Sequence, residues 1–284
     1  MALNPIFRRS FLELLIAPTM VGAGMLAYGH YLEPSQIELT QQSLILPDLP
    51  APFHNYRLVQ ISDLHMGTWL NRRRLQAVVD QVNAQQPDLI AITGDFLNHE
   101  IESKVQDLIG PLSQLKSTDG TAVVFGNHDY WSGSWLARRM VREANLLDVN
   151  NDVLSIERSG AVLNIAGIDD YWEGRTRFDL VMKRLPTTGP AILLAHEPDF
   201  ADISAATERF ALQISGHSHG GQIVLPYWGA PVLPYMGEKY VSGRYQVSKM
   251  VQYTNRGIGT SQLQIRINCR PEITTFILQS PQAV

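Results

Sequence analysis

The sequence predicts an α/β fold in which two packed mixed β-sheets are flanked by helices. Short apolar runs alternate with helical stretches through the first half of the chain, which is typical of a parallel sheet. Small polar clusters follow several of these runs directly. After Gly220 the helical pattern disappears, and apolar runs separated by Gly and Pro indicate strands that close the fold.

The first half is expected to alternate strand and helix, with strands at 56–61, 89–92 and 121–125 and helices at 72–85 and about 100–115. Asn71 can cap the first of these helices and Pro87 ends it, while Pro111 predicts a kink in the second. The order strand, helix, strand, helix, strand implies parallel strands joined by right-handed crossovers.

The second half repeats this pattern less regularly. Strands are expected at 161–168, 191–195 and 210–215, with helices near 176–185 and 198–206. Four further runs are expected to form antiparallel closing strands, at 222–225, 250–254, 263–267 and 273–278.

Length and composition favour one large globular domain. The chain has 284 residues, of which 45% are hydrophobic and 18% charged, so it can bury a core and is not disordered. A net charge of −4 gives no electrostatic reason to bind nucleic acid, and none is expected as a partner. The one cysteine, Cys269, excludes an internal disulfide and a Cys-rich zinc site, so a metal would depend on His and Asp.

The N-terminal segment differs from the rest of the chain. Arg8 and Arg9 precede an uncharged stretch at 14–28, which covers only roughly 22 Å as a helix, short of the roughly 30 Å of a bilayer core. The pair of arginines followed by Phe11 and Leu12 resembles a twin-arginine export signal. We expect export to the periplasm or cell envelope, with the segment either removed or kept as a membrane anchor. The alternative is an amphipathic or buried N-terminal helix.

These patterns divide the chain into three regions. Residues 1–34 are the expected signal or anchor, residues 35–55 a linker or edge strand, and residues 56–284 the main domain. Oligomeric state is left open.

Five polar clusters stand where predicted strands end: Asp63-Leu64-His65, Gly94-Asp95, Gly126-Asn127-His128-Asp129, His196-Glu197 and Gly216-His217-Ser218-His219. Because the carboxyl ends of parallel strands line one edge of a sheet, we expect these clusters to converge there. Side chains two positions apart on an extended backbone point the same way, so Asp-x-His and His-x-His can share a metal.

The chemical types of these residues favour two metal ions. Imidazole, carboxylate and one amide oxygen, without thiolate, suit a divalent ion such as Mn²⁺, Fe²⁺ or Zn²⁺. Seven candidate ligands exceed what one ion takes, and a shared carboxylate can bridge two ions roughly 3.5 to 4 Å apart. The candidates are Asp63, His65, Asp95, Asn127, His196, His217 and His219. His128 is then free for catalysis.

This ordered series of blocks resembles the calcineurin-like metallophosphoesterase superfamily, whose pattern D-x-H, G-D, G-N-H-D, H, G-H-x-H it matches from Tyr56 to about Ile223. The resemblance implies a four-layer αββα sandwich. It also implies that His128 is a proton donor or phosphate contact. The implied ligands of the first ion are Asp63, His65, Asp95 and His219, and those of the second are Asp95, Asn127, His196 and His217.

Three further runs, at 216–223, 255–259 and 270–273, resemble a bacterial subgroup of exported or membrane-associated phosphodiesterases. Its members include enzymes that cleave the pyrophosphate of UDP-2,3-diacylglucosamine. The resemblance therefore implies a metal-dependent phosphodiesterase or pyrophosphatase. A phosphomonoesterase or nucleotide phosphodiesterase acting on soluble substrates is one alternative, and a scaffold that binds metal without catalysis is another.

All five tryptophans fall in predicted loops near strand ends: Trp69, Trp131, Trp135, Trp172 and Trp228. They either pack in the core or form an apolar collar around the metal site, which would suit a lipid-linked substrate or a membrane surface. We also expect Asp129 to orient His128, although neighbouring side chains diverge. His99 is a weaker candidate for contact with substrate, and His30 and His54 are given no role.

Overall fold

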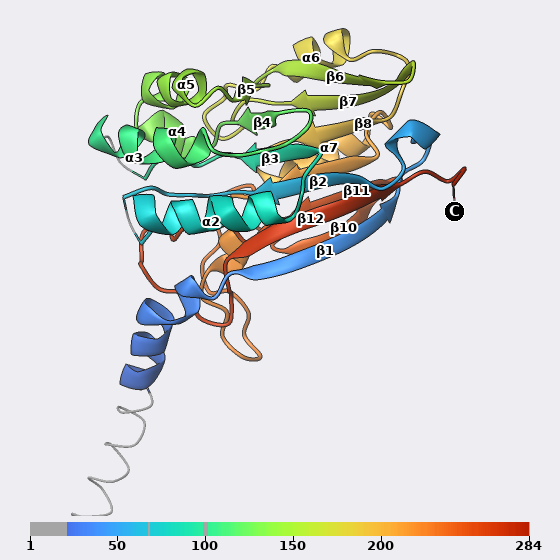
Figure 1. Cartoon of the computed structure of the whole chain (residues 1–284). Helices are drawn as coiled ribbons and strands as arrows, with labels where there is room; N and C mark the ends of the chain where they lie inside the picture. The colour runs from blue at the N-terminus through green and yellow to red at the C-terminus, as the bar shows by residue number, and fades with distance from the viewer. Residues whose placement is uncertain (1–21, 68, 99–101, 284) are drawn as a thin grey trace, which may run out of the picture.

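The computed structural model describes residues 22–67, 69–98 and 102–283 of the chain. Within them, two six-stranded sheets pack face to face, with helices on both outer surfaces (Figure 1). In sheet order, the first contains β1 (Glu38–Ile45), β12 (Glu272–Gln279), β2 (Tyr56–Ile61), β3 (Leu89–Thr93), β4 (Thr121–Val124) and β5 (Leu147–Asp148). The second contains β10 (Gly243–Val247), β11 (Met250–Thr254), β9 (Leu212–Ser215), β8 (Ala191–Leu194), β7 (Ala161–Gly167) and β6 (Asp152–Arg158).

Three hydrophobic layers hold the sandwich together. The first sheet packs against α2 (Arg72–Ala84), α3 (Glu102–Leu112) and α5 (Ser134–Glu143) through one buried cluster. A second cluster fills the space between the sheets. A third joins the outer face of the second sheet to α6 (Phe178–Arg184) and α7 (Ala201–Ala205). The predicted α/β fold of two mixed sheets flanked by helices is therefore confirmed.

Parallel pairing in the centre of each sheet brings the predicted clusters to one edge. β2, β3 and β4 are parallel neighbours, as are β7, β8 and β9. Antiparallel pairs lie toward the margins, where β12 pairs with β2, β10 with β11 and β6 with β7. Asn71 caps α2 as predicted, because its side-chain oxygen accepts a hydrogen bond from the Arg74 backbone N–H at 3.0 Å.

The prediction of closing strands at 222–225 and 263–267 is wrong. Residues 222–225 and 263–267 form loops that touch through an isolated bridge between Ile223 and Ile267. Ile223 and Leu263 line a pocket and Leu225 is exposed, so the apolar character of these runs reflects a pocket wall and surface instead of strands in a sheet. Two of the closing strands also have a parallel neighbour, since β12 pairs with β1 and β11 with β9 in that direction.

The segment after β4 is helical where loops were expected. It forms α4 (Asn127–Trp131) and α5, so Trp131 and Trp135 lie in helices rather than in loops.

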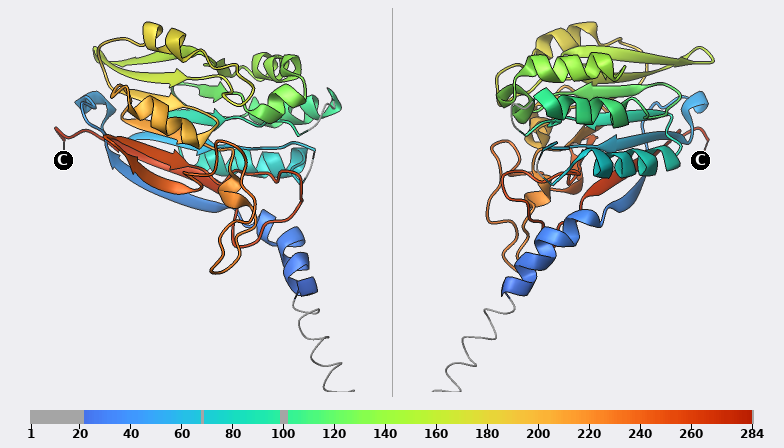
Figure 2. Two further views of the ribbon diagram at one scale, coloured as in Figure 1. Left: turned by 180° about the vertical axis from the view of Figure 1, so that it is seen from behind. Right: turned by 60° about the vertical axis from the view of Figure 1, so that its left-hand side comes forward.

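The N-terminal part of the described chain joins the first sheet at its edge. Residues 22–31 form a helix that projects from the body, followed by the short helix η1 (Glu33–Ser35), as both views of Figure 2 show. β1 then pairs along its whole length with β12. Residues 35–55 include the buried side chains of Leu44, Leu46 and Phe53, so this segment is part of the core. A further short helix, η2 (Ala51–Phe53), leads into β2.

The arginine pair at positions 8 and 9 lies outside the described residues. Among the helices that are described, none has the length and apolar character that crossing a membrane would require.

Candidate metal centre

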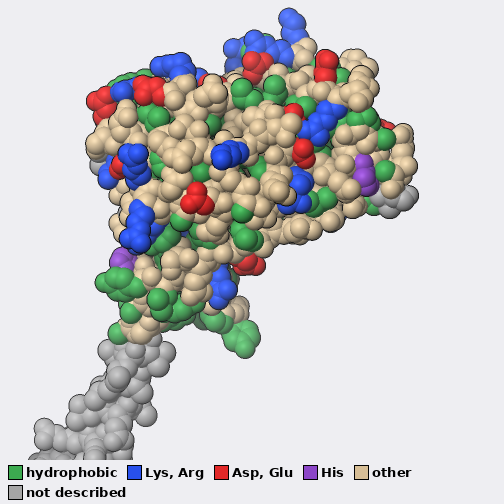
Figure 3. Space-filling view, in the orientation of Figure 1, with side chains coloured by type: hydrophobic (Ala, Val, Ile, Leu, Met, Phe, Trp, Pro, Cys, Tyr) green, Lys and Arg blue, Asp and Glu red, His purple; other side chains and the backbone are tan. Residues whose placement is uncertain are grey.

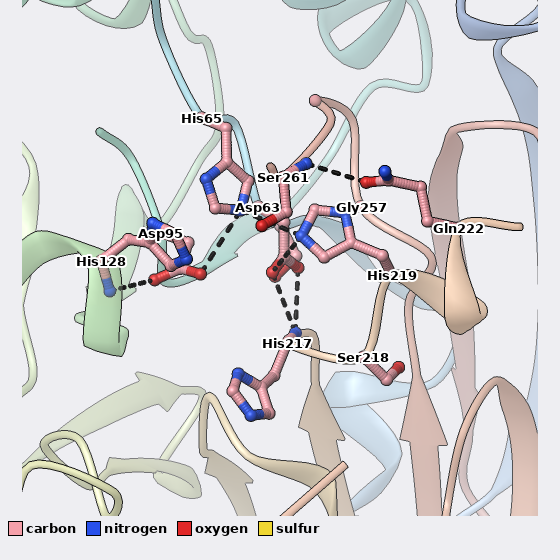
Figure 4. Close-up of polar contacts among 12 residues, drawn as sticks. Asp63, His65, Asp95, His128, His217, Ser218, His219, Gln222, Gly257 and Ser261 are labelled. Carbon is pink, nitrogen blue, oxygen red and sulfur yellow. Dashed lines mark hydrogen bonds and ion pairs between the residues drawn. The ribbon is translucent and has the colours of Figure 1, made fainter. Parts of the chain in front are cut away.

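The predicted polar clusters meet at the carboxyl edge of the two sheets, and Figure 4 shows several of them facing one another. The first sheet supplies residues from the loops after β2, β3 and β4, and the second supplies residues after β8 and β9. Three overlapping groups of side chains are close enough to hold an ion, and two of them have no residue in common: Asp63, His65 and His219 in one, and Asp95, His196 and His217 in the other.

The first group is centred on two imidazoles. The Nε2 atoms of His65 and His219 are 2.9 Å apart, and His219 Nε2 is 3.4 Å from an oxygen of Asp63. All three side chains are buried. Backbone N–H of His217 donates to both oxygens of Asp63, at 3.0 and 3.1 Å, which fixes the orientation of that carboxylate.

Asp95 of the second group also contacts the first group. The Oδ2 atom of Asp95 lies 3.3 Å from His196 Nε2 and 3.4 Å from His65 Nε2. His217 Nδ1 is 3.1 Å from His196 Nε2. One carboxylate oxygen thus touches imidazoles of both groups, which is the position that a bridging ligand needs.

Carbonyl oxygens fix which nitrogen of each imidazole carries a hydrogen. His196 Nδ1 lies 2.7 Å from the Thr93 carbonyl oxygen, and His217 Nε2 lies 2.8 Å from that of Tyr235. Because a carbonyl only accepts, each of these nitrogens donates, and the neutral ring presents a lone pair on its other nitrogen. Those two lone pairs face each other and a carboxylate, an arrangement that a cation stabilises.

The electrostatics of the buried site also favour a bound cation next to Asp95. Burial opposes a charge on His196, yet the Asp95 carboxylate raises the pKa of His196 well above its ordinary value. Burial favours a neutral Asp95 as well, but the neighbouring His196 and His128 hold the pKa of Asp95 well below its ordinary value. Without a metal, a proton on His196 supplies the cation that this carboxylate requires.

Burial keeps other candidate ligands in the neutral state. It lowers the pKa of His65 to about 3 and that of His217 to about 4, so both imidazoles are unprotonated at neutral pH. Burial raises the pKa of Asp63 to about 7. Neutral imidazole is the form that binds a metal, because its lone pair is available.

Two further observations fit a metal. Asn127 Oδ1 is buried and has no hydrogen-bond partner among the described residues, which is unusual for a buried amide oxygen. A Cβ atom added at Gly126 would lie 2.3 Å from Asp95 Oδ1 and 2.6 Å from His196 Nε2, so glycine keeps the space between these ligands open. The donor set of imidazoles, carboxylates and one amide oxygen fits divalent ions.

Backbone conformation is strained at the same residues. Five of the seven candidate ligands have a positive φ, a region that few residues other than glycine adopt. The angles are 50° for Asp63, 45° for His65, 57° for Asp95, 71° for His217 and 52° for His219. Strain of this kind persists where surrounding structure enforces it, and it concentrates at functional sites.

His128 lies beside the two groups on the pocket wall. Its ring centroid is 4.6 Å from that of His65 and 4.6 Å from that of Trp131. Its backbone N–H donates to Asp95 Oδ1 at 2.9 Å, which ties α4 to the shared carboxylate. His128 also belongs to a group with His65 and Asp95 that is close enough to hold an ion.

The expectation that Asp129 orients His128 is wrong. Its carboxylate accepts from the backbone N–H groups of Asp95, Phe96 and Gly126 at 2.9 to 3.0 Å. Asp129 therefore fixes the loops after β3 and β4 relative to each other. Because it is buried, its pKa is raised to about 7.

A pocket of about 530 Å³ opens above the metal-ligand groups. Its walls are largely apolar, and none of the described residues that line it is Lys or Arg. The apolar residues of the lining include Trp131, Trp172, Ile223, Val232, Leu233, Tyr235 and Leu263. Gln222 joins two wall loops, because its side chain accepts from Ser261 N–H and donates to the Leu263 carbonyl, both at 2.8 Å.

The five tryptophans divide into different environments. Trp131 and Trp172 line the pocket with their ring centroids 5.4 Å apart. Trp69 is buried, with the Arg74 guanidinium over its ring, while Trp135 on α5 and Trp228 in a loop are exposed. The predicted collar therefore consists of two tryptophans, and the aliphatic and proline residues of the remaining wall were not predicted. The signal that could have indicated this wall is the stretch 222–237, which contains no charged residue.

The other histidines lie away from the metal-ligand groups where they are described. His54 Nδ1 accepts from Ser280 N–H at 3.3 Å, and His30 Nδ1 is 2.8 Å from the Gln264 carbonyl oxygen. His99 lies outside the described residues.

Sequence similarity relates the chain to known metallophosphoesterases. The family model for calcineurin-like phosphoesterases matches residues 56–221, more than half of the chain. The uncharacterized metallophosphoesterase YkuE of Bacillus subtilis is 33% identical over 280 residues, covering 96% of this chain and 98% of that protein. Phosphodiesterase YaeI of Escherichia coli is 30% identical over 277 residues, covering 96% and 99%.

A vertebrate relative is longer than this chain. The transmembrane protein with metallophosphoesterase domain of Danio rerio is 30% identical over 288 residues, covering 96% of this chain and 63% of that protein.

Proposed function

Because this chain belongs to the calcineurin-like phosphoesterase family and is a metal-dependent phosphoester hydrolase, we propose that it is a dinuclear phosphodiesterase for esters bearing a lipid or another apolar group. One observation carries this proposal. The two metal-ligand groups form the floor of a pocket whose described lining includes no Lys or Arg and is mostly apolar.

Each ion would be held by side chains from both sheets. Asp63, His65, Asp95 and His219 would hold the first ion, and Asp95, Asn127, His196 and His217 the second. When bound, two divalent cations neutralise the charge that develops on the phosphoryl oxygens during displacement. Mn²⁺, Fe²⁺ and Zn²⁺ all suit this donor set.

The protein's own side chains perform the remaining steps. His128 lines the pocket and protonates the leaving oxygen, a task for which imidazole is suited near neutral pH. The carbonyls of Thr93 and Tyr235 hold His196 and His217 in the tautomers that present lone pairs to the site.

The pocket wall favours a diester over a monoester. A monoester carries an additional negative charge, for which the described lining offers no Lys or Arg. A diester instead has a second substituent that needs room. Trp131 and Trp172 on one side and Val232 and Leu233 on the other offer apolar contact to it.

Two assays test this proposal. The metal-loaded enzyme is expected to hydrolyse bis(p-nitrophenyl) phosphate faster than p-nitrophenyl phosphate, and an acylated phosphodiester in micelles faster than a soluble nucleotide diester. Preference for the monoester would favour a phosphomonoesterase, and equal rates on the soluble and acylated diesters would remove the lipid-linked substrate. Hydrolysis of neither p-nitrophenyl compound would indicate the non-catalytic scaffold, which the complete set of ligand-type side chains argues against.

We also propose that the protein acts at the periplasmic or cell-envelope face, because residues 8–12 resemble a twin-arginine signal. Replacing Arg8 and Arg9 with Lys should retain the protein in the bacterial cytoplasm, as measured by cell fractionation. Unchanged export would contradict this location signal.

A further inference from the structure

Three segments form one surface beside the pocket, which we call the apolar rim: the helix 22–31, the loop 222–237 and the loop 261–267. Backbone N–H of Arg266 donates to the Gly29 carbonyl at 2.9 Å, joining the helix to the second loop. The two loops are joined by N–H of Val224 donating to the Ile267 carbonyl at 2.9 Å. The rim is therefore a continuous, hydrogen-bonded part of the fold.

The rim combines exposed apolar side chains with an absence of exposed charge, since its one charged residue, Arg266, is buried. No Asp, Glu, Lys or Arg occurs in residues 222–237 or in residues 22–31. Large hydrophobic side chains are nevertheless exposed in all three segments: Leu26, Tyr31, Leu225, Tyr227, Trp228, Val232, Tyr235 and Leu263. Figure 3 shows hydrophobic side chains gathered at this lower end of the molecule. Contiguous exposed apolar surface of this kind marks an interaction site.

A closed turn holds two aromatic residues at the tip of the first loop. Leu225 and Gly229 exchange backbone hydrogen bonds of 2.9 Å across it. Between them, Tyr227 has a φ of 68°, a conformation that costs free energy in any residue other than glycine. Trp228 exposes 87% of its surface. The turn is thus built to present aromatic rings to the surroundings instead of burying them.

The rim is continuous with the mouth of the pocket. Val232, Tyr235 and Leu263 belong to both, since each lines the pocket and is also exposed. The chain that enters the rim at residue 22 follows a stretch, residues 14–21, that has no charged side chain. Whatever covers the rim therefore also meets the entrance to the metal centre.

We propose that the apolar rim docks on the surface of a lipid bilayer, so that the pocket mouth faces the membrane. Trp and Tyr are the residues that favour the interface between lipid and water, where a ring has one apolar and one hydrated side. A rim with so little charge binds through buried apolar area, so its attachment does not depend on anionic lipids. This inference rests on the proposed function, because docking brings the pocket to its substrate only if that substrate is lipid-linked and enters from the membrane.

A fluorescent label at the tip of the loop tests the docking directly. Cys269 is buried, so a cysteine introduced by Trp228→Cys is the accessible thiol among the described residues. We would attach an environment-sensitive dye and add phosphatidylcholine vesicles that contain a lipid-borne quencher. The dye should shift to shorter wavelength and lose most of its emission. The matched control is Trp135→Cys on α5, where the dye should stay in water and keep its emission.

Attachment through the N-terminal segment alone would leave both dyes unquenched, and that result would overturn the proposal. A dye at position 228 that responds only when a protein from the same cells is added would also overturn it in favour of a protein partner. Quenching only in the presence of anionic lipid would contradict binding through apolar area.

Activity separates this proposal from the proposed function. The double variant Tyr227→Ser/Trp228→Ser should hydrolyse soluble bis(p-nitrophenyl) phosphate at the original rate, because neither residue lines the pocket. It should bind vesicles on the order of tenfold more weakly, since the area that it can bury is smaller. If the original protein docks but prefers soluble diesters, docking stands and the lipid-linked substrate fails. If it prefers acylated diesters without docking, the reverse holds.

Discussion

The two ends of the sandwich differ in whether their polar side chains have partners within the fold. At the start of β2, the Tyr56 hydroxyl donates to Asp119 at 2.8 Å, and Arg158 donates to the same carboxylate at 2.7 Å and to Asp88 at 3.1 Å. Beyond the end of the same strand, His196 Nε2 and His217 Nδ1 lie 3.1 Å apart and Asn127 Oδ1 lacks a partner among the described residues.

The difference separates stability from function. The polar side chains at the start of β2, which we call the paired end, bind one another and stabilise the fold. The side chains beyond the end of β2, which we call the metal end, lie on strained backbone and are arranged for the proposed metal ions. Substitutions at the two ends should therefore have opposite consequences.

The largest expected effect is loss of activity at the metal end. Asp95→Asn keeps the oxygen that accepts from His128 but removes the charge shared by the two groups. We expect at least about 10³-fold slower hydrolysis of bis(p-nitrophenyl) phosphate and loss of bound metal, because the substitution removes the proposed bridging ligand. Metal analysis and steady-state rates measure this. Retention of both metal ions at full occupancy would contradict the bridging role.

The next effect concerns proton transfer. His128→Ala should slow cleavage of an alkyl phosphodiester by about 10²- to 10⁴-fold, since general-acid catalysis contributes this much. The loss should be much smaller for a p-nitrophenyl ester, whose leaving group departs without a proton. Metal content should be unchanged. Equal losses on both esters, or loss of metal, would show that His128 has another role.

At the paired end the expected effect is on stability. Arg158→Met leaves Asp88 and Asp119 without their cation, and because this site is partly exposed we expect a loss of about 1 to 2 kcal/mol in the free energy of unfolding. The turnover of folded enzyme should not change. Arg177→Met, in an exposed ion pair with Asp179, is the control and should change stability by less than about 0.5 kcal/mol. Urea denaturation and kcat distinguish the outcomes.

The smallest effect appears only in alkaline solution. Burial raises the pKa of Tyr56 well above its ordinary value of 10.0. Above that pH the unfolded chain loses this proton while the folded chain keeps it, so stability falls as pH rises. Tyr56→Phe should remove this contribution, which is about 1.4 kcal/mol per pH unit for one proton. An unchanged slope of unfolding free energy above pH 10 would contradict the assignment.

The sequence was sufficient to predict that the candidate metal ligands lie close together. Asp63, Asp95 and His196 each follow a short apolar run, and such runs in a parallel sheet end at the same edge. Local pattern and sheet topology therefore agree at these positions. The same reasoning located β2, β3 and β4 within a residue, because buried central strands carry a strong apolar signal.

Tertiary structure determined what the sequence did not show. The runs at 222–225 and 263–267 have strand-like composition, yet their side chains serve the pocket and the apolar rim. The carbonyl of Tyr235 that orients His217 belongs to a segment without regular structure, so periodicity gives no indication of it. β6 and β10 were missed because margin strands that are partly exposed lack the continuous apolar run.

The position of β12 has a consequence for the order in which the chain folds during synthesis. This strand inserts between β1 and β2, so β1 has no partner in the first sheet until residues 272–279 have left the ribosome. Ile258 and Gly259, which donate to the carbonyls of Ser62 and Asp63, are also made late. A nascent chain that has already produced every candidate metal ligand therefore still lacks the backbone donors that bind the carbonyls of Ser62 and Asp63, and the candidate site is completed only near the end of translation.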